Sequence, residues 1–213
     1  MLQSISLASA DIALDPCWLP KPQADRLFSR LLQDVPWAVH RLRIFGREVD
    51  SPRLSCWIGD PGARYRYSGS LFEPHPWPMV LLPVREQLQQ VLGVPFNSVL
   101  ANRYRDGRDA MGWHRDDEPE LGPRPTIASV SLGATRRFAL KPVTGEGRRG
   151  AFELTHGSLL VMRGDTQRRF QHALPRTRRA VGERINLTFR HVRIACDQQA
   201  AQNANAPLRR EPH

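Results

Sequence analysis

The chain has 213 residues, 40% of them hydrophobic, and a formal net charge of +10 at pH 7. This length predicts one domain with a sizeable core, and the composition excludes a wholly disordered chain. Lys21 and Lys141 are the only lysines, so arginine supplies nearly all of the positive charge. Because a guanidinium is a planar fork of donors that suits phosphates and base edges, this charge favours a nucleic-acid partner over a charge that serves only solubility.

The cysteines and the N-terminus bear on the compartment. Cys17, Cys56 and Cys196 are far apart and show no metal-ligand spacing, which is typical of free thiols in a reducing compartment. The N-terminal residues lack a basic start and a long apolar run, so no signal peptide is predicted, and no apolar run is long enough to span a membrane. We therefore expect a cytoplasmic monomer with no membrane contact and no obligate protein partner.

Two amphipathic helices are predicted in the first half of the chain. The first covers residues 23–35, where leucines and one phenylalanine recur at helical spacing. The second lies within residues 76–93 and has Gly93 as its C-cap. The apolar stripe of the second helix consists of Leu81, Val84, Leu88, Val91 and Leu92.

From about Asn97 onward, short alternating runs are separated by turn signals, which predicts a series of antiparallel strands. Helices followed by many short strands favour a mainly β fold, with a jelly-roll or sandwich core packed against N-terminal helices. We expect a single domain over residues 1–196, with an N-terminal extension over 1–95 and the β core over 97–193. The polar tail 197–213 is predicted to be disordered.

His114 and Asp116 are two residues apart, so on a strand their side chains would point the same way and could converge on one ion. His172 follows after several predicted strands. Two histidines and one carboxylate form the facial triad that holds iron(II) and leaves positions open for oxygen and a cosubstrate. The His-x-Asp triplet alone is a weak signal, and zinc or another divalent ion could replace iron.

Residues 184–190 predict a strand with two different faces. Period two places Arg184, Asn186, Thr188 and Arg190 on one face and three apolar residues on the other. Two arginines along one strand face suit a small dicarboxylate held at both ends. The alternative is an exposed edge strand with two solvated arginines.

Asn102 and Tyr104 share one face of an earlier predicted strand, while Arg103 and Arg105 lie on the other. Their side chains could add hydrogen bonds to the same anion, although Tyr104 alone is an ordinary strand residue. Three polar strand faces directed at one cavity predict a binding site more strongly than any one of them.

In this order, the motifs resemble the AlkB family of nucleic-acid dioxygenases. The similar stretches are NRYRDG, HRDDE, IASVSLGATRRF, HGSLLVM and RINLTFR, within about residues 40–193. The resemblance implies a double-stranded β-helix core that uses iron(II), 2-oxoglutarate and O2. It implies hydroxylation of an N-alkyl group, which leaves as an aldehyde, with succinate and CO2 as the other products.

The resemblance also implies roles for the matching residues. The iron ligands would be His114, Asp116 and His172. The residues around 2-oxoglutarate would be Arg184 and Tyr104 at the distal carboxylate, Arg190 and Asn102 at the metal-chelating end, and Asn186 in support.

Acidic residues follow the predicted metal ligands directly. Bases methylated on a ring nitrogen, such as 1-methyladenine and 3-methylcytosine, are cationic, and a nearby carboxylate would favour them over neutral bases. In the family an acidic residue of this stretch has that role; Glu118 is the first choice here and Asp117 the second. The alternative is a solvated acidic turn before Pro119.

By the same resemblance, residues of about 40–70 would recognise the nucleotide. Tyr67 would stack on the base against His114, Tyr65 would hydrogen-bond nearby, and Trp57 is a weaker candidate. For each of these aromatic residues, an ordinary place in the core is the alternative.

Phe45 would share a strand face with several arginines, which is unusual for a core residue. Family members that act on duplex DNA have an apolar finger in the matching place, so Phe45 is a candidate wedge in the base stack. The alternative is a loop in which Phe45 is simply buried.

Three functions remain open at this point. A DNA-repair demethylase is favoured, because the Phe45 segment and the HRDDE stretch favour DNA over RNA. The same chemistry on RNA or another substrate is the second. The third is a non-catalytic nucleic-acid-binding module, against which the complete triad and the two arginines argue.

Overall fold

The computed structural model describes residues 1–44, 47–67 and 70–193, and of residues 42–48 and 65–71 it describes no side chains. Phe45 and the predicted tail 197–213 therefore lie outside the described residues, as do the side chains of Tyr65 and Tyr67.

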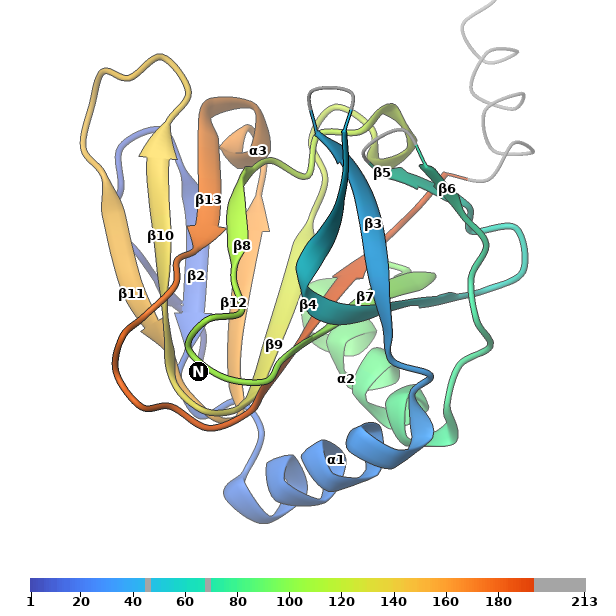
Figure 1. Ribbon diagram of the computed structural model, residues 1–213. Coiled ribbons are helices and arrows are strands. Elements are labelled where there is room, and N and C mark those ends of the chain that lie inside the picture. The colour runs from blue at the N-terminus through green and yellow to red at the C-terminus, as the bar shows by residue number, and fades with distance from the viewer. Residues whose placement is uncertain (45–46, 68–69, 194–213) are drawn as a thin grey trace, which may run out of the picture.

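Within the described ranges, two antiparallel sheets face each other as a sandwich (Figure 1). The larger sheet has the order β1-β2-β12-β9-β14-β7-β4-β3 and the smaller one the order β11-β10-β13-β8. The strands of the larger sheet are β1 (Gln3–Ser4), β2 (Asp11–Asp15), β3 (Ala38–Ile44), β4 (Arg47–Gly59), β7 (Ser98–Tyr104), β9 (Ile127–Gly133), β12 (Ser158–Arg163) and β14 (Arg184–Arg190). Those of the smaller sheet are β8 (Met111–His114), β10 (Arg136–Pro142), β11 (Gly150–Leu154) and β13 (Phe170–Leu174).

The remaining elements are short, apart from two helices. A separate hairpin joins β5 (Tyr65–Tyr67) to β6 (Ser70–Phe72). The helices are α1 (Lys21–Asp34), α2 (Leu82–Leu92) and the single turn α3 (Thr166–Arg169), with 3-10 turns η1 (Met79–Leu81) and η2 (Pro119–Leu121). This mainly β sandwich with flanking helices confirms the predicted fold class. No helix in the described part of the chain is long and apolar enough to cross a bilayer.

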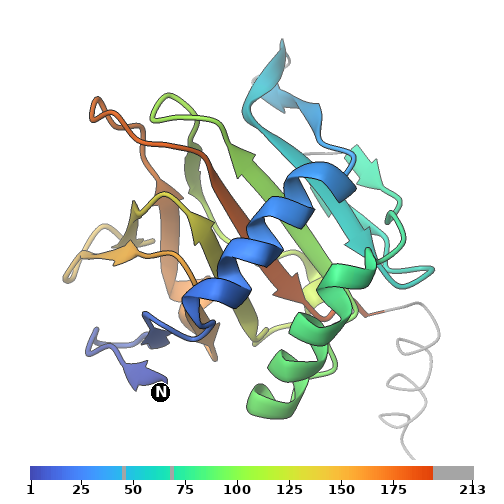
Figure 2. The same cartoon turned by 90° about the horizontal axis from the view of Figure 1, so that it is seen from below.

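Helices α1 and α2 lie across the same outer face of the larger sheet (Figure 2). Leu27 and Leu31 from α1 and Leu88 from α2 are fully buried against the apolar side of the sheet. Gly93 ends α2 in the left-handed conformation with φ +65°, as predicted for a C-cap. Val91 was wrongly placed in the apolar stripe, because it is 51% exposed. Leu92, the next residue of the predicted stripe, does pack against the core.

Six described strands, β1 to β6, precede residue 97, so the expectation that strands begin there was incomplete. Strand β2 pairs with β12, and β4 pairs with β7, so the larger sheet runs across the predicted boundary at residues 95–97. Strand β4 is hard to detect because its polar residues Ser51, Arg53 and Ser55 are buried rather than exposed. Its sequence therefore lacks the usual contrast between a polar solvent face and an apolar core face.

Strand β14 lies between β7 and β9 in the middle of the larger sheet. All seven of its residues are buried, which excludes the exposed-edge alternative. Its apolar side chains Ile185, Leu187 and Phe189 join the core beneath α1 and α2. Its polar side chains alternate with these and point into the space between the sheets, where the site forms.

Candidate active site

The three predicted metal ligands meet between the sheets. One ligand atom of each of His114, Asp116 and His172 lies within 4.8 Å of the others. His114 ends β8 and is paired in register with His172 of β13, and their ring centroids are 4.2 Å apart. The prediction that Asp116 lies on the same strand as His114 was wrong, because β8 ends at His114.

Asp116 reaches the site from the segment that follows β8. Its backbone N–H donates to Gln167 Oε1 of α3 at 3.0 Å, which holds this segment against the sandwich. Its Oδ1 accepts from Arg190 Nη2 at 2.8 Å, at the end of β14. Its Oδ2 is buried and has no hydrogen-bond partner in the described part of the structure.

The tautomer of His114 is set by its surroundings. His114 Nδ1 lies 2.8 Å from the carbonyl oxygen of Gly112, which can only accept, so Nδ1 carries the proton. Nε2 then keeps its lone pair, and a hydrogen bond of this kind orients metal-binding histidines generally.

The pKa values favour the ligand forms of all three residues. Burial is the largest single influence on Asp116 and would raise its pKa, but Arg190, with further contributions from His172 and His114, outweighs burial and brings the pKa to about 2. Burial and the neighbouring His114 lower the pKa of His172 to about 3, and burial also lowers the pKa of His114. At neutral pH the triad therefore offers one carboxylate and two neutral imidazoles. A divalent cation fits this donor set and would satisfy the buried Asp116 Oδ2.

The second feature of the site is a buried cation. Arg184 is 1% exposed, and its Nη2 donates to Ser131 Oγ at 2.9 Å and Asn186 Oδ1 at 2.8 Å. Its guanidinium carbon lies 5.2 Å from the centre of the Tyr104 ring, and its Nε has no hydrogen-bond partner among the described residues. No described carboxylate forms an ion pair with it, and burial lowers its pKa to about 10. An anion in this place would satisfy both the charge and the free Nε.

The metal triad and the buried cation open onto one cavity. Its atom-free space, with its mouth included, is about 450 Å³. Eight predicted metal and cosubstrate residues line it: Asn102, Tyr104, His114, Asp116, His172, Arg184, Asn186 and Arg190. The period-two predictions for β7 and β14 are therefore confirmed. Arg103 and Arg105, predicted to point away from the cavity, pair instead with Glu183 and Asp109.

Several residues in or beside the site were not predicted from the sequence. Ser129 Oγ donates to Asn186 Oδ1 at 2.9 Å, and Asn186 Nδ2 donates to Thr188 Oγ1 at 2.8 Å, so these contacts hold the Asn186 amide in place beside Arg184. Ser129 and Ser131 alternate with apolar residues in β9, and this alternation was the available signal for them. Nothing in the local sequence pointed to Gln167 or to the buried Arg53.

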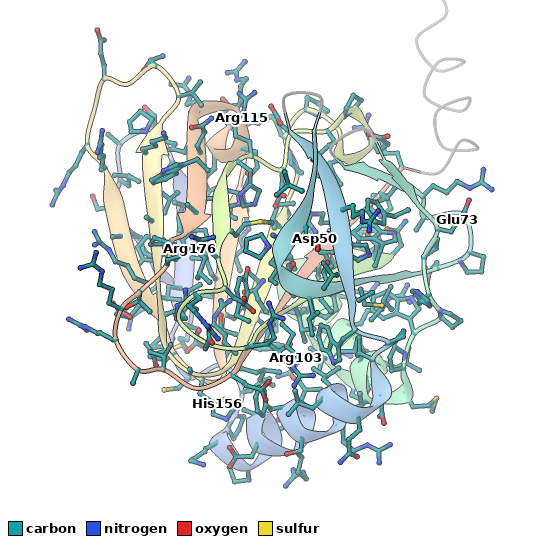
Figure 3. The ribbon with its side chains drawn as sticks, viewed as in Figure 1. Asp50, Glu73, Arg103, Arg115, His156 and Arg176 are labelled. Carbon is teal, nitrogen blue, oxygen red and sulfur yellow. The ribbon has the colours of Figure 1, made fainter. Side chains whose placement is uncertain are left out.

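The predicted substrate residues are only partly described. Asp117 is exposed and forms an ion pair with Arg115 at 2.7 Å; Figure 3 shows Arg115 above β8. Glu118 is half-buried and precedes the 3-10 turn η2 as its N-cap. Trp57 was a wrong choice for base stacking: it is 2% exposed, and its Nε1 donates to the carbonyl oxygen of Ala63 at 2.8 Å within the core.

Two histidines and a carboxylate inside a jelly roll define a non-haem iron oxygenase. The buried cation of Arg184 supplies a binding site for an anionic cosubstrate. The model of the 2OG-Fe(II) oxygenase superfamily matches residues 11–190. Mouse and human DNA oxidative demethylase ALKBH2 are both 41% identical over 182 residues, which cover 81% of this chain and 76% and 70% of those proteins. Bovine alpha-ketoglutarate-dependent dioxygenase alkB homolog 3 is 40% identical over 190 residues, 85% of this chain and 66% of that protein.

The chain therefore belongs to the AlkB family of the 2OG-Fe(II) oxygenase superfamily. Membership implies that Fe(II), 2-oxoglutarate and O2 are its cofactor and cosubstrates, as the motifs predicted. The solved structure of OsALKBH1 has a similar fold, with a TM-score of 0.58 and 18% identity over 90% of this chain and all of that chain.

Proposed function

We propose that the chain is a 2-oxoglutarate-dependent dioxygenase that demethylates N-alkylated bases, 1-methyladenine and 3-methylcytosine, in DNA. One observation supports this most: the metal triad and the uncompensated cation of Arg184 share a single cavity. Relatives of known name that are about 40% identical include DNA oxidative demethylases. We further propose that residues 1–196 form one dioxygenase domain, with 1–95 as an N-terminal extension of the core.

In this proposal the triad residues His114, Asp116 and His172 hold Fe(II), which supplies the oxidative chemistry when bound. Arg190 keeps Asp116 ionised and turned toward the metal, because it neutralises Oδ1 and leaves Oδ2 for the ion.

The cosubstrate would lie between the metal and Arg184. Arg184 and Tyr104 take the distal carboxylate of 2-oxoglutarate, and Asn102 and Arg190 steady the end nearest the metal. Asn186 holds the Arg184 side chain in position, since its Oδ1 accepts a hydrogen bond from Arg184 Nη2.

The preference for a methylated base would come from charge. A base alkylated on a ring nitrogen is cationic, and the carboxylate of Glu118, two residues after the metal ligand Asp116, would favour it over a neutral base. Asp117, which forms an ion pair with Arg115, is the second candidate. We propose base recognition by Tyr65 and Tyr67 and insertion of Phe45 into the duplex.

Positive surface charge supports a nucleic-acid partner. Arg137 of β10 and Arg176 and Arg179 of the loop after β13 line one hollow of the surface. Figure 3 shows Arg176 on this loop, in front of the smaller sheet. We propose that these arginines contact phosphates and make binding depend on salt, that DNA is preferred to RNA, and that the protein acts as a cytoplasmic monomer.

Formaldehyde release from 3-methylcytosine tests the proposal. Duplex DNA, single-stranded DNA and RNA of one sequence are compared with Fe(II), ascorbate and 2-oxoglutarate, beside an Asp116→Ala control. Release from DNA that disappears in the control supports the proposal. Faster release from RNA would favour the second candidate, which the same cavity also supports. Turnover of 2-oxoglutarate without formaldehyde would refute the substrate, and no turnover with iron bound would refute the enzyme.

A further inference from the structure

A third arginine is buried at the edge of the cavity, and neither the triad nor the proposed cosubstrate contacts account for it. Arg53 lies on β4 and is 4% exposed. Its neighbour Ser55 pairs in register with Asn102 of β7, so Arg53 lies on the same face of the sheet as the cavity residue Asn102. Arg53 Nε donates to Asn102 Oδ1 at 2.7 Å.

This hydrogen bond determines which way the Asn102 amide faces. A guanidinium has only donors, so the atom of Asn102 that faces Arg53 has to be the oxygen. The NH2 group is then the half of the amide that remains for the cavity, where it can donate to an anion. The reverse orientation would present an oxygen to the anion and would repel it.

The charge of Arg53 is also uncompensated. Among the described residues no carboxylate lies within ion-pair distance of Arg53 or of Arg184, whereas Arg190 is paired with Asp116 at 2.8 Å. Two buried guanidinium groups without counter-ions are unfavourable. A ligand with two negative charges, one near each arginine, would balance them.

We propose that Arg53 is a positioning residue for the cosubstrate: it fixes the Asn102 amide so that Nδ2 donates into the cavity, and its charge favours a dicarboxylate there. The proposal rests on the assignment of this cavity to 2-oxoglutarate. Arg53 acts through Asn102 and is not a metal ligand.

A double-mutant cycle measures the coupling directly. The affinity of the Fe(II)-loaded protein for 2-oxoglutarate is measured without O2 by calorimetry, for wild type, Arg53→Met, Asn102→Ala and the double variant. Each single change should weaken binding about tenfold, the scale of one hydrogen bond. The double variant should be little worse than Asn102→Ala alone, because Arg53 acts through that amide. Arg53→Lys should recover part of the affinity, since an ammonium also only donates.

Arg103 offers a matched control. It lies on β7 next to Asn102 but on the opposite face, where it pairs with Glu183 at 2.6 Å (Figure 3). Arg103→Met removes a cation from β7, the strand of Asn102, without altering the cavity. The affinity for 2-oxoglutarate should therefore not change.

Asn102→Asp provides a second test that keeps a partner for Arg53 and therefore the fold. It replaces the donor with a carboxylate oxygen, so 2-oxoglutarate should bind about a hundredfold more weakly, and thermal melting of the ligand-free protein should show no loss of stability.

The outcomes are distinct. Equal affinity of wild type and Arg53→Met, additive effects in the cycle, or normal binding by Asn102→Asp would each overturn the role of Arg53 and leave the proposed function standing. A wild-type protein that does not bind 2-oxoglutarate would overturn the cosubstrate assignment and this inference with it. Coupled binding without demethylation would leave the inference intact and refute only the substrate.

Discussion

Replacement of Arg184 by methionine should separate ligand affinity from stability. A carboxylate that takes Nε and one Nη gains two hydrogen bonds to a charged group, each of about 1.5–3 kcal/mol. Their loss, about 3–6 kcal/mol, corresponds to an affinity for 2-oxoglutarate about 10²–10⁴-fold weaker. The ligand-free protein should be as stable as wild type or more so, because a buried cation without a described counter-ion is removed. Asn186 Oδ1 would still accept from Ser129 Oγ.

Two measurements on one preparation test this reasoning. Anaerobic calorimetry with Fe(II) gives the affinity, and thermal melting of the ligand-free protein gives the stability. Addition of 2-oxoglutarate should raise the melting temperature of wild type and leave that of Arg184→Met unchanged. An affinity within about threefold of wild type, or less than about 0.7 kcal/mol, would refute the assignment of Arg184. A strongly destabilised variant would refute the claim that its charge is uncompensated.

Three further predictions concern the fold and the metal-free site. Gly133→Ala should destabilise the protein by about 1–3 kcal/mol, because Gly133 has φ +84° and a Cβ there would lie 2.4 Å from the carbonyl oxygen of Glu183; an unchanged urea midpoint would contradict this. With a chelator present, stability should fall as the pH drops from 6.5 toward 3, since folding holds the pKa of His172 at about 3 and the unfolded chain binds the proton. His172→Gln should flatten that slope of urea midpoints against pH, and an identical slope would count against it. Val91→Glu should change the urea midpoint little, because Val91 is 51% exposed; a large loss would place it in the core.

The sequence predicted best where a strand has one polar and one apolar face inside the protein. In residues 184–190 polar and apolar side chains alternate strictly, and Asn102 and Tyr104 are two residues apart on one strand. Period two alone therefore separated the side chains that face the cavity from those on the other side of the sheet. The histidines alone were a weak signal, and the resemblance to a family turned three separate patterns into one site.

The remaining site residues depend on contacts that local sequence does not encode. Asp116 reaches the metal site from beyond the end of β8, and Gln167 holds it from a distant single helical turn. Arg53 lies in a strand whose inward face is polar and which contains Pro52, so neither alternation nor strand propensity revealed it. Strand pairing across long stretches of chain, as between β2 and β12, brought the N-terminal segment into the sheet.

Strand β8 forms the edge of the smaller sheet and pairs with β13 alone among the described strands, through an irregular register. So few backbone hydrogen bonds make this segment a place where local unfolding is easy. His114 closes β8, Asp116 lies just beyond it, and His172 is on the neighbouring strand. An ion shared by these three residues would tether the loose edge to the rest of the sandwich. Metal binding and the local unfolding of β8 are thus linked equilibria. Slower amide hydrogen exchange in β8 would therefore report that the metal is bound.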